Sequence, residues 1–278
     1  MKKESIGKLA LLVATLLWGF GFIAVENALI YGWSPLALLG ARGIIGGTTL
    51  GLLSIQNKWY KDKKLLKAGI KVGIVMFAGF IFQTYGQLYS TPSTTAFLTT
   101  LYVVFTPLLS WLVLKQKMKK RLFISIILAL VGSFVLCYRE GMSFQLGDIL
   151  ILICALFFAI HIMLLDQHHT LDPISFTAVQ LLTTGILSLS GMLIMQESPK
   201  MTAWWSVLYG GLIASALASC LQTYGQKYVK SSVASLILSL ESVFGALCSL
   251  LFLNETLTIN IIAGGTLLFV AVLTSELN

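Results

Sequence analysis

Four side chains that could do chemistry stand inside long apolar stretches of the sequence: Glu26, Arg42, His161 and Glu241. Placing a charged or titratable group in such surroundings is costly, so each one invites a functional hypothesis. A carboxylate can bind a cationic group or take up a proton, a guanidinium can hold a carboxylate, and an imidazole can relay protons. The sequence has no nucleotide-binding P-loop and no HExxH zinc motif, so ATP hydrolysis and metalloprotease chemistry are not expected.

The composition indicates which solvent surrounds the protein. Of the 278 residues, 57% are hydrophobic and 11% are charged, whereas soluble domains have roughly 25% charged residues. So few charges cannot coat a water-facing surface, and we expect membrane lipid as the surrounding solvent. The net charge of +8 comes from short basic clusters between apolar runs, so no nucleic-acid partner is expected. The four cysteines lie in apolar runs without a CxxC pair; we interpret them as free thiols and expect no metal and no cofactor.

Ten apolar segments are long enough to cross a bilayer, which takes about 20 residues of helix. We therefore predict an all-α integral membrane protein with ten transmembrane helices. Pro35 and Pro173 stand where a proline fits the first turn of a helix, and Pro107 is expected to kink the fourth span. The predicted spans are 8–29, 35–55, 69–90, 93–114, 121–138, 147–166, 173–195, 203–226, 231–253 and 259–276.

The distribution of basic residues predicts the orientation. With the N-terminus inside, 16 of the 19 Lys and Arg residues flank the cytoplasmic ends of the spans, whereas only Arg139 and Lys200 lie outside and Arg42 lies within a span. Positive residues accumulate on the cytoplasmic side of membrane proteins. We therefore expect a multi-pass protein of the cytoplasmic (inner or plasma) membrane with both termini in the cytoplasm.

One polar heptapeptide occurs twice. The segment QTYGQLY at 83–89 recurs as QTYGQKY at 222–228, 139 residues later, which is half of the chain. We therefore predict two repeats, 1–139 and 140–278, with five helices each. Because five is odd, the second repeat enters the membrane from the opposite side, an inverted topology that is typical of secondary transporters with a site near the midplane.

Glu241 is expected close to the middle of the ninth span, where it could bind a cation or carry a coupling proton. Its counterpart in the first repeat is Tyr102, which we expect to face it across the pseudo-twofold axis. The structural alternatives are a carboxylate hydrogen-bonded to a neighbouring helix and an aromatic packing residue.

Glu26 and Arg42 are expected at similar depths near the outer side, where they could form a structural or gating ion pair; alternatively, Arg42 could hold a substrate carboxylate. His161, in the sixth span, is either a packed, hydrogen-bonded residue or a proton relay.

Two pairs of glutamines each occupy one helical face. Gln83 and Gln87 are one turn apart in the third predicted span, and Gln222 and Gln226 are one turn apart in the eighth. Inversion would place the first pair near the outside and the second near the cytoplasm, at opposite mouths of one pathway. Hydrogen bonding between helices is the alternative, because it also favours glutamine in membranes.

Several short motifs resemble the EamA-type members of the drug/metabolite transporter superfamily. Segment 17–22 resembles the opening Trp-Gly helix, 34–42 resembles the second helix with its arginine, and 240–247 resembles the motif LEPVFAAL. The stretch 253–257 resembles the signature GE-x-L that follows. The sequence departs from the pattern at Ser242, where the family usually has proline.

The resemblance extends over nearly the whole chain and implies a ten-helix inverted-repeat fold with alternating access. It implies small organic solutes such as amino acids or related metabolites, often exported, and it adds Trp18 to the candidate substrate-binding residues. A small-molecule substrate, and with it a coupling proton, are the expected partners. A channel, a membrane sensor and a membrane enzyme are the alternatives, although the sequence has no reactive cluster and no appended soluble domain for the last two; we expect no enzyme. The sequence does not predict an oligomeric state.

Overall fold

The computed structural model describes residues 3–90, 92–115, 119–138, 145–197, 202–252 and 258–276. All regular structure in these ranges is helical. The helices are α1 (Lys3–Ile30), α2 (Pro35–Leu53), η1 (Ile55–Asn57), η2 (Trp59–Lys61), α3 (Lys63–Gln87), α4 (Pro92–Thr99), α5 (Tyr102–Leu114), α6 (Lys120–Cys137), α7 (Leu146–Gln167), α8 (Pro173–Ile194), α9 (Trp204–Leu208), η3 (Tyr209–Leu217), α10 (Ala218–Gln226), α11 (Ser231–Leu238), α12 (Glu241–Phe252) and α13 (Ile259–Glu276).

Within the described ranges, eight helices or helix runs have the length and apolar character needed to span a membrane. They are Lys3–Ile30, Pro35–Leu53, Lys63–Gln87, Thr94–Val113, Leu146–Gln167, Pro173–Ile194, Trp204–Gln226 and Ser231–Cys248. The predicted spans 121–138 and 259–276 coincide with α6 and α13, which are helical but are not among these eight.

Two helices begin at the prolines that the sequence singled out. The Ser34 hydroxyl accepts a hydrogen bond from the Ala37 amide at the start of α2. The Asp172 carboxylate accepts one from the Ser175 amide at the start of α8. Each side chain thus satisfies an amide that has no partner inside the helix, and the following proline has no amide to satisfy.

Two of the spanning runs are interrupted at matching places. The first run breaks between Thr99, where α4 ends, and Tyr102, where α5 begins. The second breaks between Leu238, where α11 ends, and Glu241, where α12 begins. Tyr102 and Glu241 are 139 residues apart, the same separation as that of the recurring heptapeptide. α6 and α13 begin and end at residues with this separation as well.

Side-chain hydroxyls accompany both interruptions. Thr100 Oγ1 donates to the Phe97 carbonyl at 2.7 Å, and Ser239 Oγ donates to the Leu236 carbonyl at 2.7 Å. Such bonds to a carbonyl one turn back compete with the regular helical ladder and favour a bend. The fourth predicted span is thus interrupted before Pro107, and Pro107 itself lies within α5.

The eighth predicted span is a continuous run of α9, η3 and α10 whose middle part, η3, is a π-helix. In a π-helix the amides bond one residue further back than in an α-helix, which widens the turn. Short π-helical segments occur frequently at functional sites. η3 lies against α1 and α2, and it places its residues beside the centre of the bundle.

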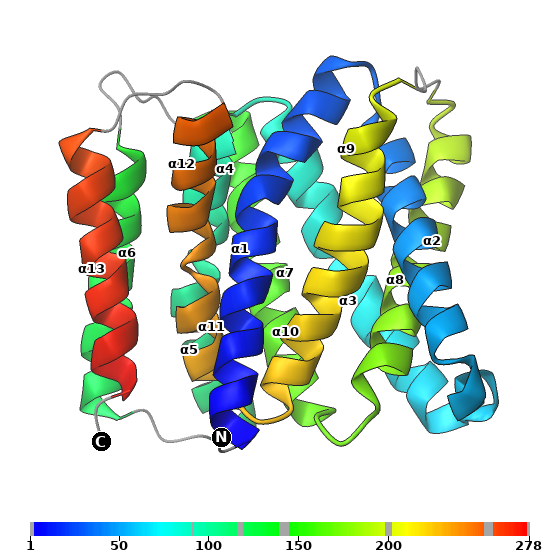
Figure 1. Ribbon diagram of the computed structural model, residues 1–278, viewed down its shortest axis with the longest axis horizontal. Coiled ribbons are helices and arrows are strands. Elements are labelled where there is room, and N and C mark those ends of the chain that lie inside the picture. The colour runs from blue at the N-terminus through cyan, green and yellow to red at the C-terminus, as the bar shows by residue number, and fades with distance from the viewer. Residues whose placement is uncertain are drawn as a thin grey trace.

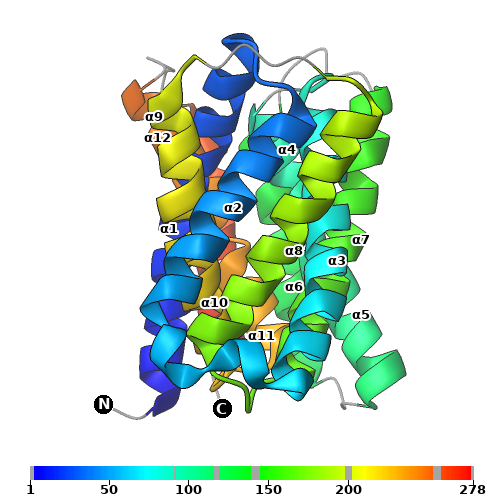
Figure 2. The same ribbon diagram turned by 90° about the vertical axis from the view of Figure 1, so that its right-hand side faces the viewer.

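The bundle has two peripheral pairs of helices with the remaining helices between them. α6 packs on α13 at one side, and α2 packs on α8 at the other (Figure 1). The start of α1 and the end of α13 lie at the same end of the bundle in both views (Figures 1 and 2). The interrupted runs lie between the pairs, so both breaks occur inside the protein rather than at its periphery.

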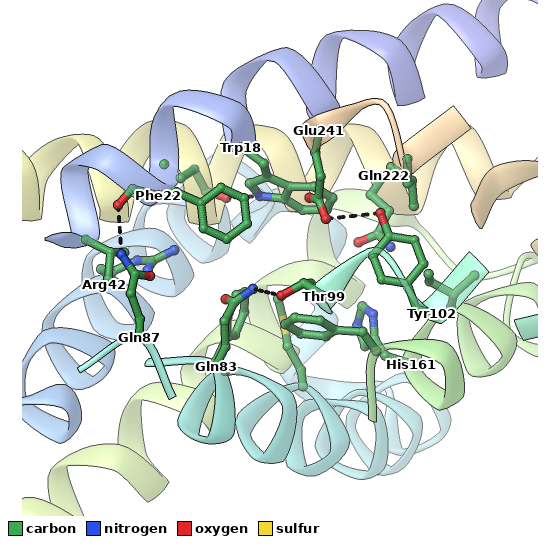
Figure 3. A pocket seen from close by; sticks show the side chains of 18 residues that line it. Trp18, Phe22, Arg42, Gln83, Gln87, Thr99, Tyr102, His161, Gln222 and Glu241 are labelled. Atoms are coloured by element: carbon green, nitrogen blue, oxygen red, sulfur yellow. Dashed lines mark hydrogen bonds between the residues drawn. The ribbon is translucent and has the colours of Figure 1, made fainter. Parts of the chain in front are cut away.

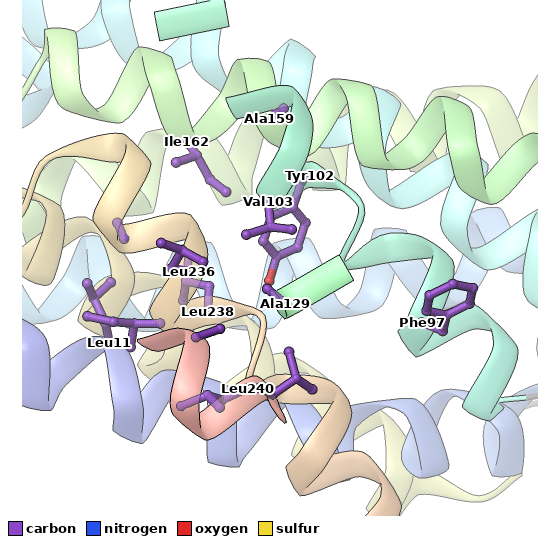
Figure 4. Packing of buried hydrophobic residues seen from close by; sticks show 14 of the residues in the cluster. Leu11, Phe97, Tyr102, Val103, Ala129, Ala159, Ile162, Leu236, Leu238 and Leu240 are labelled. Atoms are coloured by element: carbon purple, nitrogen blue, oxygen red, sulfur yellow. The ribbon is translucent and has the colours of Figure 1, made fainter. Parts of the chain in front are cut away.

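The largest buried apolar cluster surrounds the two breaks (Figure 4). It includes Val103 just after the first break and Leu238 and Leu240 at the second, together with Leu11 of α1 and Ile162 of α7. Tyr102 belongs to the same cluster. The helix ends at the two breaks are therefore surrounded by side chains from other helices. This packing keeps the backbone groups at the breaks away from lipid.

Candidate functional site

Tyr102 and Glu241 are the first residues of α5 and α12, and their side chains meet at the centre of the bundle. The Tyr102 hydroxyl donates a hydrogen bond to Glu241 Oε1 at 3.2 Å. Both residues are buried, with exposed fractions of 3% and 5%. Glu241 lies in the first turn of α12, where the amino end of the helix places a partial positive charge near its side chain.

A cavity of about 70 Å³ adjoins this contact (Figure 3). That volume is enough for a few water molecules or for the polar part of a small organic molecule. The polar lining residues are Arg42, Gln83, Gln87, Thr99, Tyr102, His161, Gln222 and Glu241, and the others are Trp18, Gly21, Phe22, Val25, Met76, Phe80, Phe158, Ile162, Ala214 and Leu238. The cavity thus combines groups of opposite charge with aromatic and aliphatic walls.

Three of the four predicted glutamines line this cavity, and the fourth does not. Gln83 Nε2 donates to Thr99 Oγ1 at 3.1 Å, and Gln87 Nε2 donates to the Phe22 carbonyl at 3.1 Å. Gln222 is buried in the cavity wall. Gln226 is outside the lining and donates to the Ile162 carbonyl at 2.8 Å. Gln226 therefore has the interhelical bonding role that was the alternative, while the arrangement of the two pairs at opposite mouths of one pathway stays a prediction.

Trp18 contributes both a wall and a hydrogen bond. Its indole Nε1–H donates to the Ala214 carbonyl of η3 at 2.7 Å. The bond fixes the ring of α1 against the π-helix, and both residues line the cavity. Trp18 thus connects the cavity directly to the irregular part of the α9–η3–α10 run.

Arg42 and Glu26 are not joined in an ion pair in the part of the chain that the structure describes. Arg42 Nε–H lies 3.3 Å from both the Gly210 carbonyl and the Ser215 hydroxyl of η3. Glu26 Oε2 instead accepts a hydrogen bond from Gln87 Nε2 at 3.2 Å. The expected pair is replaced by two separate sets of contacts, because the π-helix offers Arg42 a carbonyl and Gln87 offers Glu26 an amide.

His161 lines the cavity and is buried. Its Nε2 lies 2.9 Å from Gln180 Oε1, and Gln180 Nε2 donates to the Phe176 carbonyl. Because the Gln180 oxygen can only accept, this arrangement requires a proton on Nε2 of His161. Gln180 of α8 therefore holds the ring in place, as expected for a packed histidine. The ring also borders the cavity, which is where a proton relay would have to lie.

Sequence reasoning missed most of the apolar wall. Phe80 and Phe158 pack edge to face with ring centroids 5.2 Å apart, and Met76 lines the cavity beside them. These residues lie in runs where nearly every neighbour is apolar, so nothing in the sequence separates a wall residue from a lipid-facing one. In the described part of the chain, no group of three or more His, Cys, Asp and Glu residues could hold a metal ion.

Comparison with known proteins decides the family. A family model described as the EamA-like transporter family matches residues 5–138 and again residues 145–276. The chain belongs to this family. It is a multi-pass membrane protein with the all-helical architecture described above, and its resemblance to the EamA type is confirmed.

Two curated relatives and one solved structure agree with this assignment. An uncharacterized transporter of Archaeoglobus fulgidus is 36% identical over 275 residues, covering 98% of this chain and 86% of that protein. The uncharacterized transporter YoaV of Bacillus subtilis is 26% identical over 272 residues, covering 94% of this chain and 93% of that protein. A protein crystal structure with 16% identity superposes with a TM-score of 0.83 and covers 98% of both chains, which shows that the fold is shared.

Proposed function

We propose that this EamA-like protein is a secondary active transporter that moves a small polar organic solute by alternating access. The observation that supports this most is the buried contact between Tyr102 and Glu241. It joins the two interrupted helix runs beside a central cavity, where a solute can be enclosed between two halves of the protein. Family membership and the names of the relatives point to a transporter rather than to an enzyme.

We further propose ten spans in two inverted repeats, 1–139 and 140–278. Three observations support this arrangement. The two helix breaks lie 139 residues apart in the sequence, and the bounds of α6 lie 139 residues before those of α13. The family model matches each half of the chain once. α6 and α13 are peripheral and pack on each other, which suits two equivalent spans at the edge of the bundle (Figure 1).

We propose that the protein lies in a cytoplasmic (inner or plasma) membrane and that both of its termini are on the cytoplasmic side. The start of α1 and the end of α13 lie at the same end of the bundle (Figure 1). Lys58, Lys61, Lys63 and Lys64 lie in or next to the segment that joins α2 to α3, and basic residues favour the cytoplasmic side.

We propose amino acids or related compounds as the solute class and export as the direction of transport. The solute class is supported by the cavity, which has a cation, a carboxylate and apolar walls in one enclosure. The direction rests on the resemblance to the family alone. A coupling proton is proposed on Glu241, because this buried acid borders the cavity and the Tyr102 hydroxyl is its one hydrogen-bond donor among the residues that the structure describes.

Substitution of Glu241 tests this assignment. In proteoliposomes, Glu241→Gln should lower the rate of labelled amino-acid transport by about tenfold or more and abolish its dependence on pH, because the amide cannot bind and release a proton. Glu197→Gln is the matched control: Glu197 accepts a hydrogen bond from Tyr85 and is not among the residues lining the cavity. Unchanged transport and pH dependence in Glu241→Gln would show that the assigned role is wrong.

A further inference from the structure

Arg42 is a buried cation at the end of the cavity away from Glu241. Its exposed fraction is 6%. Figure 3 shows Arg42 and Gln87 at one end of the cavity and Glu241, Tyr102 and Gln222 at the other. α2 therefore places a positive charge and α12 places a carboxylate at opposite ends of one enclosure.

The guanidinium has more donors than the protein uses. It has five N–H groups, and in the described part of the chain only Nε–H has hydrogen-bond acceptors, the Gly210 carbonyl and the Ser215 hydroxyl at 3.3 Å each. No carboxylate among the described residues pairs with it. Arg42 Cζ lies over the Phe80 ring, 5.5 Å from the ring centroid; the ring attracts the cation but accepts no ordinary hydrogen bond.

Such an arrangement is costly unless an anion completes it. A buried charge without a partner destabilises a protein, and replacing it with a neutral side chain is then neutral or favourable. The four Nη–H groups form a planar fork that matches the two oxygens of a carboxylate. The free donors of Arg42 at the cavity wall therefore specify the type of group that the cavity accepts there.

The π-helix keeps this fork in position. A Cβ added at Gly210 would lie 2.9 Å from Arg42 Cδ and 3.0 Å from its Nε, so glycine is what permits the close approach. The hydrogen bonds from Nε–H to η3 hold the guanidinium in position. Its Nη–H groups are then available to donate hydrogen bonds to a ligand.

Charge balance favours a monovalent carboxylate over a phosphate. Arg42 is the single lysine or arginine among the residues that line the cavity, and Glu241 lines it as well. A dianion would meet one cation and one carboxylate, whereas one carboxylate on the solute is matched by Arg42 alone.

We propose that Arg42 is the binding site for the carboxylate of the transported solute, so that a molecule without this carboxylate is rejected. The proposal rests on the transporter function proposed above and specifies which solutes it accepts. It assigns Arg42 to recognition instead of to an ion pair with Glu26.

The test uses purified protein and three matched sets of probes. The first set is L-leucine and L-phenylalanine, the second is the corresponding amines without the carboxylate (3-methylbutylamine and 2-phenylethylamine), and the third is the corresponding acids without the amine (4-methylpentanoate and 3-phenylpropanoate). A bound ligand raises the melting temperature. At least one amino acid and its matched acid should raise it, while the matched amine should not. Arg42→Gln should weaken the binding of that carboxylate probe by about tenfold to a hundredfold, and Arg42→Lys, which keeps the charge but loses the fork, by less.

The melting temperature without ligand provides a second readout. If Arg42 serves recognition, Arg42→Gln should melt at the same temperature or higher, because a buried charge without a counter-charge is removed. A structural clamp would instead melt at a lower temperature, and so would contradict the proposal.

Three other results would overturn the proposal: amines that stabilise the wild type as well as the amino acids do, carboxylate binding that survives in Arg42→Gln, or no stabilisation of the wild type by any carboxylate probe. Transport measurements separate this failure from that of the proposed function. If a labelled amine is transported and Glu241→Gln blocks it, the protein is a transporter and the role of Arg42 is wrong.

Discussion

At the scale of single residues, the site depends on pairing a hydroxyl with a carboxylate inside a membrane protein. Tyr102 and Glu241 occupy equivalent places after the two helix breaks, yet one is an aromatic hydroxyl and the other an acid. Two ionised carboxylates at these places would repel each other at short range. The Tyr102 hydroxyl instead donates to the carboxylate, which keeps Glu241 in position beside the cavity.

Tyr102→Phe should separate this role from ordinary packing. The change removes one hydrogen bond to a buried carboxylate and should lower the free energy of unfolding by about 1–3 kcal/mol. It should also slow transport, because Glu241 loses the donor that positions it. Tyr209→Phe is the matched control, since the Tyr209 hydroxyl donates to the Leu17 carbonyl at 2.7 Å and Tyr209 is not among the residues lining the cavity.

Chemical denaturation or thermal melting gives the stability of both variants, and uptake into proteoliposomes gives the rate. The control should lose stability and keep its transport rate. Equal transport rates in the two variants would contradict a functional role for the Tyr102 hydroxyl.

The chemistry of the site was more accessible from sequence than its walls were. Glu241 and Arg42 stand out because charges are rare in these runs, and the repeat relates Tyr102 to Glu241. The contacts of Arg42 could not be predicted, because they depend on a carbonyl of a π-helix. Nor could the separation of Gln226 from the cavity, which follows from how α10 packs against α7.

At the scale of helices, close crossings define how the bundle packs at two places. A Cβ added at Gly86 of α3 would lie 2.6 Å from Ile151 Cγ1, and one added at Gly225 of α10 would lie 2.6 Å from Leu11 Cγ. Gly86 and Gly225 occupy the same place in the recurring heptapeptide. The two crossings, α3 with α7 and α10 with α1, are therefore equivalent contacts of the two halves in our proposal.

Gly86→Ala and Gly225→Ala should each lower the free energy of unfolding by about 1–3 kcal/mol, because the added methyl group forces helices apart. Gly265→Ala is the control: its Cβ would lie 3.7 Å from Val243 Cγ1, an ordinary contact distance. In a helix interior this control should be neutral or gain up to about 1 kcal/mol. Thermal melting in detergent measures all three, and a control as unstable as the other two would contradict this explanation.

The helix bounds were largely predictable, because hydrophobic length and proline position determine them. The predicted spans 35–55 and 173–195 correspond to Pro35–Leu53 and Pro173–Ile194. The breaks were not predicted, since Ser239 and Thr100 interrupt their helices through hydroxyl bonds that many uninterrupted helices also contain. Proline is a clearer signal, yet α5 runs across Pro107.

At the scale of the whole molecule, our account predicts which loops face which side of the membrane. In a variant without native cysteines, Tyr31→Cys should react with a membrane-impermeant maleimide in intact cells, whereas Lys61→Cys should react only after the cells are opened. Tyr31 lies between α1 and the start of α2, whereas Lys61 is the last residue of η2, beyond the end of α2. The two residues therefore lie at opposite ends of α2. The opposite labelling pattern would show that the proposed orientation is inverted, and labelling of both sites in intact cells would contradict the number of crossings.

The central claim is that the protein is a carrier with a site that opens to one side at a time. Counterflow tests it most directly: proteoliposomes loaded with an unlabelled amino acid are diluted into a trace of the same labelled compound. A carrier exchanges one molecule for another, so the account predicts that labelled solute accumulates transiently inside above its external concentration. Influx that rises only to equilibrium and does not saturate would indicate a channel and contradict the account.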